Sequence, residues 1–81
     1  MALKAHIYYR KHARERMIER QVSALDVDHL LKSSPVVRVE PHQRETRWNV
    51  RGRDLDGREI EVVVVVIEDA IEIHVVTVIE K

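Results

Sequence analysis

Three side chains near the start of the chain are spaced so that a helix would bring them into one row. His12, Arg16 and Arg20 are each four residues apart, which makes them neighbours on one helix face. Guanidinium groups bind phosphate oxygens with paired hydrogen bonds, and an imidazole can transfer a proton near neutral pH. The row could therefore hold an anion and act on it. In the alternative interpretation the arginines pair with acids such as Glu19, and His12 only hydrogen-bonds Thr77 or backbone.

A second set of basic side chains lies in residues 42–53, whose sequence is HQRETRWNVRGR. Alternation along an extended strand puts Arg47, Asn49 and Arg51 on one face, with Arg53 continuing the series. Such a strip suits contacts with the sugar-phosphate backbone of a nucleic acid. Ordinary charge pairing with acids of residues 59–72 is an equally good explanation.

A third candidate is His74, which we expect on the outward face of a strand with Glu72 beside it. The two side chains could form a proton-transfer pair or contribute to a metal site. Two ligands do not define a metal site, and the five histidines show no coordinating spacing. The chain has no cysteine, which excludes thiol chemistry and cysteine zinc sites. We therefore predict neither a metal nor a cofactor.

The hydrophobic pattern that must position these residues changes its period at Pro35. The apolar residues of 9–20 and 23–32 repeat with helical spacing. Ser23 begins the second helix with a capping-box-like Ser-Ala-Leu-Asp, and we expect this helix to bury Leu25. From Val36 onward, apolar and polar residues alternate as in strands. Valine and isoleucine dominate the apolar residues, which also favours a sheet. Residues 5–8 are a candidate short leading strand.

The turns predict how the strands pair. Residues 54–57, Asp-Leu-Asp-Gly, fit a turn that sets Arg53 opposite Glu59 and Arg51 opposite Glu61. The apolar run 62–67 suits a central strand. A two-residue turn at 68–69 would place the following residues toward the helices: Val62, Val64, Val66, Ile71, Ile73, Val75 and Thr77. The opposite face would hold Val63, Val65, Val76 and Val78.

These patterns predict one α+β domain over residues 1–81, with two N-terminal helices packed on one face of a four-stranded antiparallel sheet. No apolar run approaches the ~20 residues of a membrane span, and no signal peptide is evident, so we expect a cytoplasmic protein without membrane contact. The net charge is zero, but residues 1–58 hold 13 Lys and Arg against eight Asp and Glu. The outward valines need cover, which predicts a homo-oligomer or another protein partner.

Two blocks of the sequence resemble a known bacterial family, the domain of unknown function 4258. The first block is His12-Ala13-x-x-Arg16-Met17-x-x-Arg20-x-Val22-Ser23. The second is Arg51-Gly52-Arg53-x-x-Asp56-Gly57-Arg58, followed by the valine run and Val75-Val76-Thr77-Val78. The resemblance covers roughly residues 5–80. Gln21 stands where members of the family usually have glycine, which predicts a less sharp end to the first helix.

That family is similar in layout to the RelE and BrnT type toxins of toxin–antitoxin pairs, which cleave RNA without a metal. The resemblance implies a RelE-like fold, attack of a ribose 2′-hydroxyl on its own phosphodiester, and partners that are RNA and a small antitoxin protein. His12 or His74 would transfer protons, and Arg16, Arg20 and Arg47 would hold the phosphate. The competing hypothesis is a non-enzymatic interaction module that uses an apolar outer sheet face.

Overall fold

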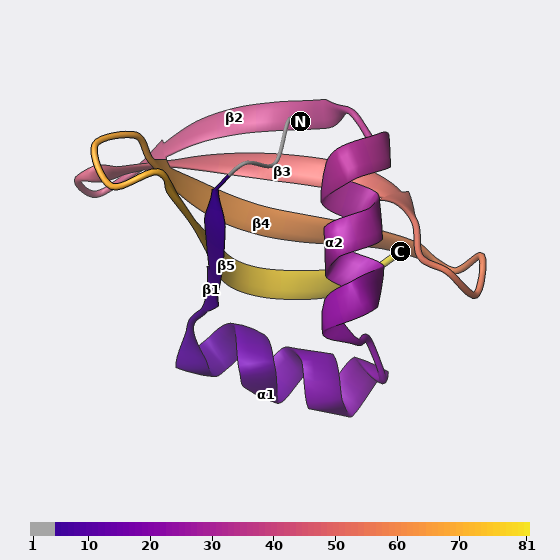
Figure 1. Cartoon of the computed structure of the whole chain (residues 1–81). Coiled ribbons are helices and arrows are strands. Elements are labelled where there is room, and N and C mark those ends of the chain that lie inside the picture. The colour runs from indigo at the N-terminus through magenta and orange to yellow at the C-terminus, as the bar shows by residue number, and fades with distance from the viewer. Residues whose placement is uncertain (1–4) are drawn as a thin grey trace.

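The chain folds into two helices on one face of a twisted sheet (Figure 1), in a computed structural model that describes residues 5–81. Its elements, in chain order, are β1 (His6–Tyr9), α1 (Lys11–Arg20), α2 (Ala24–Ser33), β2 (Val36–His42), β3 (Glu45–Arg53), β4 (Glu59–Ile67) and β5 (Glu72–Glu80). The strand order in the sheet is β1-β5-β4-β3-β2. This arrangement confirms the α+β class and the helix-covered face.

The sheet has five strands and is mixed, so the prediction of four antiparallel strands is wrong in this detail. The candidate leading strand forms as β1, and it pairs parallel with β5, from His6 opposite Glu72 to Tyr9 opposite Val75. Because β5 is the last strand of the antiparallel meander, it offers a free edge. Tyr9 belongs to this strand, and α1 therefore begins at Lys11 and not at residue 9.

The ends of the two helices are well defined. Ser23 and Asp26 form a complete capping box, which confirms the predicted start of α2. Gln21 ends α1 in the left-handed conformation, with φ of 55°. Its amide and that of Val22 donate to the carbonyls of Ile18 and Met17. Glutamine thus makes the same tight helix end that glycine favours, and the expectation of a less sharp end is wrong.

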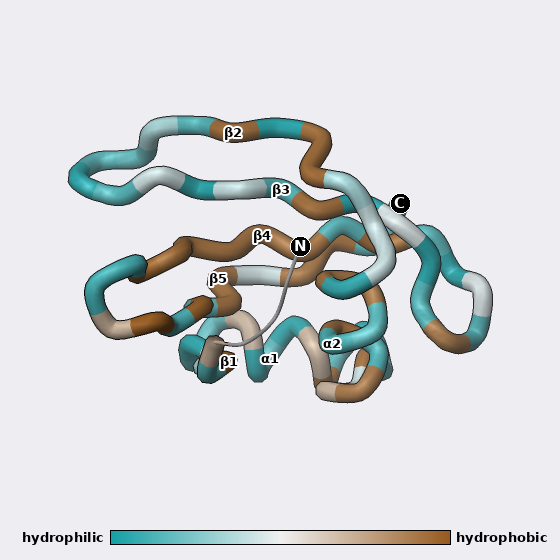
Figure 2. The backbone as a smooth tube through the Cα atoms, turned by 45° about the horizontal axis from the view of Figure 1, so that its top comes forward, coloured by the Kyte–Doolittle hydropathy of each residue, from teal (hydrophilic) through white to brown (hydrophobic). Residues whose placement is uncertain are grey.

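The core lies between the helices and the sheet face toward them. Figure 2 shows apolar residues along most of β4, as the prediction of a central strand requires. Leu25 is exposed, contrary to expectation, because the inward stripe of α2 runs through Val27, Leu30 and Leu31. The buried apolar residues of this core are Ala13, Val22, Val27, Leu30, Leu31, Val50, Ile60, Val62, Val64, Ile73, Val75 and Val78.

The register between β3 and β4 is the one predicted from charge. Arg53 lies opposite Glu59, and Arg51 lies opposite Glu61. Gly57 closes the turn with φ of 85°. A turn residue with positive φ and two opposite-charge pairs were therefore enough to align these strands.

The predicted register between β4 and β5 is wrong by two residues. The connection spans residues 68–71 and includes Ile71 in the left-handed region, so that Val66 pairs with Ile73. A bulge farther along β5 adds one residue, which reverses the alternation. Thr77 is consequently on the outer face opposite Val63, and Val78 is in the core.

Candidate nucleic-acid interface

The sheet face away from the helices carries a row of side chains that crosses four strands. The register places Arg47 of β3 beside Val65 of β4, Val65 beside His74 of β5, and His74 beside Tyr8 of β1. Residues directly opposite each other in neighbouring strands project from the same face. Two predicted site residues, Arg47 and His74, are therefore on one surface, which we call the outer face.

Around this row the structure assembles a polar group that we call the outer-face cluster: Tyr8, Arg10, Glu45, Arg47, Glu72 and His74. A two-bond ion pair joins Arg10, just before α1, to Glu45 at the start of β3. The Nη1 and Nη2 atoms of Arg10 donate to the two Glu45 carboxylate oxygens at 3.1 and 2.9 Å. The hydrogen bond from Arg10 is the main cause that lowers the pKa of Glu45 below its usual value, so Glu45 is a carboxylate at neutral pH.

His74 has a contact at each ring nitrogen. Its Nε2 lies 2.8 Å from Oε1 of Glu72, and its Nδ1 lies 3.5 Å from Nη2 of Arg10. A guanidinium can only donate, so the tautomer that satisfies both contacts has its proton on Nε2 and a lone pair on Nδ1. The Tyr8 ring lies beside the imidazole, with centroids 5.5 Å apart. A carboxylate therefore orients an imidazole whose basic nitrogen faces a cationic group.

Arg47 is the unsatisfied member of the cluster. Its Nε atom is buried and has no hydrogen-bond partner among residues 5–81, and its side chain makes no ion pair there. A buried donor without an acceptor is unfavourable, and each such group in a native fold needs an explanation. An anion from outside the chain would pair with the charge of this guanidinium, which has no ion-pair partner among residues 5–81.

The floor beneath the cluster is apolar but already covered. Val63, Val65 and Val76 are 6%, 3% and 8% exposed, although no helix lies on this face. The expectation that outward valines form an exposed patch is therefore wrong, and Val78 is not on this face at all. The homo-oligomer predicted from that patch remains a prediction without this support.

The three residues of the helical row lie on α1, which packs against β5 through the buried Ala13. His12 and Arg20 are exposed, and partly buried Arg16 pairs with Glu19 at 2.8 Å. Among the described residues, no hydrogen bond or ion pair joins the row to His74, Arg47 or Thr77. The row is adjacent to the cluster only through the chain, because Arg10 directly precedes α1.

The rest of the basic strip has partners within the chain. Asn49 is buried and donates to Glu61 at 2.9 Å, and Arg51 donates to Glu59 at 2.6 Å. Arg53 donates to the Gly57 carbonyl at 2.8 Å. Each of these three side chains has a partner within the chain, but only Arg51 forms the charge pair that the alternative expected. Their role in nucleic-acid binding remains a prediction.

Sequence reasoning missed Arg10, Glu45 and Tyr8 as members of the site. Arg10 and Glu45 are 35 residues apart, so no local spacing connects them. One signal was available: Glu45 is the single acid in the arginine-rich segment 42–53, which marks it as a partner for a cation. Within residues 5–81, no group of three or more candidate ligands could hold a metal ion. No helix in that range is long and apolar enough to cross a membrane.

The fold and this surface define a small α+β protein with a histidine–carboxylate pair on an open sheet face. A family model described as domain of unknown function (DUF4258) matches residues 9–80, and the chain belongs to that family. No curated protein and no solved structure is similar enough to the chain to match it.

Proposed function

We propose that the protein is a toxin-like RNA-binding protein of a toxin–antitoxin type system, and that its outer-face cluster cleaves RNA without a metal. The observation that carries the proposal is the position of His74, whose ring contacts Glu72 at one nitrogen and Arg10 at the other. Arg47, which has no partner among residues 5–81, lies in the same row across the sheet. A base, its orienting carboxylate and two cations are the groups that phosphodiester cleavage by a neighbouring hydroxyl requires.

In the proposed reaction, Nδ1 of His74 takes the proton from a ribose 2′-hydroxyl. The 2′-oxygen attacks the adjacent phosphorus, the bond to the 5′-oxygen breaks, and that oxygen takes a proton from water. The products are a 2′,3′-cyclic phosphate and a 5′-hydroxyl end. Arg47 and Arg10 bind the non-bridging oxygens, whose negative charge grows in the transition state. DNA lacks the attacking hydroxyl, so it should bind without being cut.

The remaining predicted residues have a supporting place in this proposal. We assign His12, Arg16 and Arg20, which follow Arg10 in the chain on α1, to contacts with the RNA backbone. The competing idea of an interaction module on an apolar outer face lacks its surface, because the valines there are buried.

The test combines RNA binding and cleavage by the purified chain in the presence of a chelator. Fluorescence polarisation with a labelled single-stranded RNA measures affinity, and gel electrophoresis measures cleavage. His74→Ala should slow cleavage by roughly 10²–10⁴-fold while changing affinity little. Arg47→Ala should weaken binding by about tenfold, since a hydrogen bond to a charged group contributes ~1.5 kcal/mol or more.

Lys32→Ala is the control, because Lys32 is an exposed cation on α2, outside the predicted site, and pairs with Asp28 at 2.9 Å. Cleavage that persists unchanged in His74→Ala would disprove the assigned base. Failure of the parent chain to bind RNA at low salt would overturn the whole proposal. Binding through about three phosphates should give log K a slope near −2 against log salt.

A growth assay tests the toxin-like role directly. Induction of the parent chain in a bacterial host should arrest growth, and His74→Ala should relieve the arrest. His12→Ala and Arg16→Ala, which alter only the proposed backbone contacts, should relieve it in part. Unimpaired growth with the parent chain at high expression would contradict a toxin role.

A further inference from the structure

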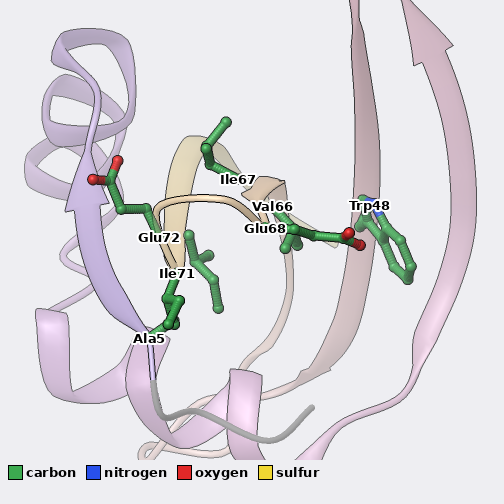
Figure 3. Close-up of a pocket in the computed structure, with 8 residues that line it drawn as sticks. Ala5, Trp48, Val66, Ile67, Glu68, Ile71 and Glu72 are labelled. Carbon is green, nitrogen blue, oxygen red and sulfur yellow. The ribbon is translucent and has the colours of Figure 1, made fainter.

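The helices leave one end of their own sheet face uncovered, and an apolar pocket of about 370 Å³ lies there (Figure 3). Trp48 of β3 forms one side, Val66 and Ile73 form the base, and the β4–β5 connection forms the other side. Glu72 of the outer-face cluster also lines this pocket. The other members of that cluster do not.

The β4–β5 connection holds an apolar side chain at this pocket in a strained conformation. Ile71 has φ of 53°, a region that β-branched residues rarely occupy, and its side chain is 61% exposed. Backbone strain and exposure of an isoleucine are both unfavourable in an isolated molecule. Another apolar surface over Ile71 would account for its exposure, and the burial gained would offset the backbone strain.

The rim of the pocket is acidic. Glu68 is exposed and makes no ion pair among residues 5–81, and in Figure 3 its carboxylate extends across the pocket toward Trp48. Asp69 follows it and is also exposed and unpaired within that range. An occupant should therefore present an apolar side chain next to a cation.

The chain itself displays such a group on α1. Ile18 is 79% exposed, the largest exposed fraction among the exposed large apolar residues described. Arg14 lies one helical turn earlier and lines the same shallow surface hollow as Ile18. Arg14 makes no ion pair within residues 5–81, whereas the neighbouring Glu19 is already paired with Arg16.

We propose that this pocket binds a second copy of the chain, with Ile18 of one copy seated between Trp48 and Ile71 of the other. Arg14 of the first copy pairs with Glu68 of the second. The helix and the pocket are different patches, so the contact is heterologous: it closes into a dimer or ring where the geometry is reciprocal and extends into a chain where it is not. This self-association does not depend on the proposed RNA activity.

Sedimentation velocity of the full chain over a wide concentration range tests the contact. The parent chain should sediment faster than a 9.5 kDa monomer as its concentration rises. Glu68→Arg and Arg14→Glu should each weaken association at least tenfold. The double variant Glu68→Arg with Arg14→Glu should return to within a few-fold of the parent, because the pair is restored with its charges exchanged.

Ile71→Gly separates the contact from the fold. Glycine tolerates the positive φ, so the melting temperature of this variant should rise, while its association should weaken because the apolar contact is lost. Ile18→Ser should weaken association as well, and Leu25→Ser, at another exposed apolar residue, should not. A parent chain that stays monomeric at all concentrations would overturn the proposal, as would a folded double variant that fails to associate.

Discussion

Two charged regions of this molecule use similar residues to different ends. One is the β3–β4 connection, where buried Asp54 accepts hydrogen bonds from the amides of Asp56 and Arg58 and from Nε of Arg58. The Nη atoms of Arg58 then donate to the carbonyls of Arg20 and Gln21 at 2.6 and 2.7 Å. This closed network holds the end of α1 against the sheet.

The outer-face cluster differs because its hydrogen bonding is incomplete. Arg47 has a buried nitrogen without a partner among residues 5–81, and the Arg10 and Glu45 side chains are about one third exposed. The Arg58 guanidinium, in contrast, has an acceptor at each of its three nitrogens. The comparison teaches that the family signature here marks residues with a structural role. Asp56, Gly57 and Arg58 of that signature build the β3–β4 connection, whereas Arg47 of the outer-face cluster lies outside it.

The largest loss of stability is expected when the carboxylate of Asp54 is removed from the β3–β4 connection. Asp54→Ala leaves two backbone amides and a guanidinium nitrogen without their acceptor, so the free energy of unfolding should fall by about 3 kcal/mol. Urea unfolding measures this value. Asp56→Ala, at an exposed neighbour in the same turn, is the control and should stay within ~0.5 kcal/mol of the parent. A loss below ~1 kcal/mol in Asp54→Ala would show that the network is not what holds α1.

A smaller effect is expected at Gly52, where β3 passes close to the end of α2. A Cβ atom there would lie 2.0 Å from Oγ and 2.7 Å from Cβ of Ser34. Gly52→Ala should therefore destabilise the fold by about 2 kcal/mol through overpacking. Adding Ser34→Gly should recover most of the loss, and a double variant as unstable as the single one would rule out this clash.

Asp26 should make the hydrogen-bonded network at the β3–β4 connection sensitive to acid. Hydrogen bonds from the Ser23 amide, first in importance, and from the Leu55 amide lower the pKa of Asp26. Because the folded pKa lies below the unfolded value of about 4, the stabilisation is complete above that pH and is lost as pH falls through the folded pKa. Asp26→Asn should lower stability by about 1 kcal/mol at pH 7 and reduce its pH dependence below pH 4. Equal acid sensitivity of parent and variant would contradict this role.

The smallest change in stability is expected in the outer-face cluster, where the same substitution should strengthen RNA binding. Glu45→Gln removes an ion pair whose two side chains are about one third exposed, so stability should change by less than about 0.5 kcal/mol. Arg10 would then be free for phosphate, and RNA affinity should rise by roughly fivefold, the equivalent of ~1 kcal/mol. Glu19→Gln on α1 is the matched control. Weaker RNA binding in Glu45→Gln would show that Glu45 serves the site instead of competing for it.

Much of the fold follows from local chemistry in the sequence. The Ser23 capping box and the Gly57 turn with its flanking charge pairs were sufficient to place α2 and to align β3 with β4. The alignment of β5 could not be obtained in this way. It depends on an isoleucine in a left-handed turn and on a bulge, and both contradict the local preferences from which a prediction is made.

The candidate site was predictable only where its residues are close in sequence. His74 and Glu72 are two residues apart on one strand, and they were expected as a pair. The helical row of His12, Arg16 and Arg20 was evident from spacing, but spacing does not determine which strand the row approaches. Arg10 meets His74 across 64 residues, a contact that depends on β1 joining the sheet in parallel.

That parallel pairing also determines the order in which the residues of the outer-face cluster can meet during synthesis. The first strand, ending at Tyr9, has no neighbour until β5, beginning at Glu72, has been made. Both helices and strands β2, β3 and β4 are synthesised while Tyr8 still lacks His74, although Arg10 can already meet Glu45. The histidine–carboxylate pair, which lies on β5 itself, is thus the last part of the cluster to be synthesised.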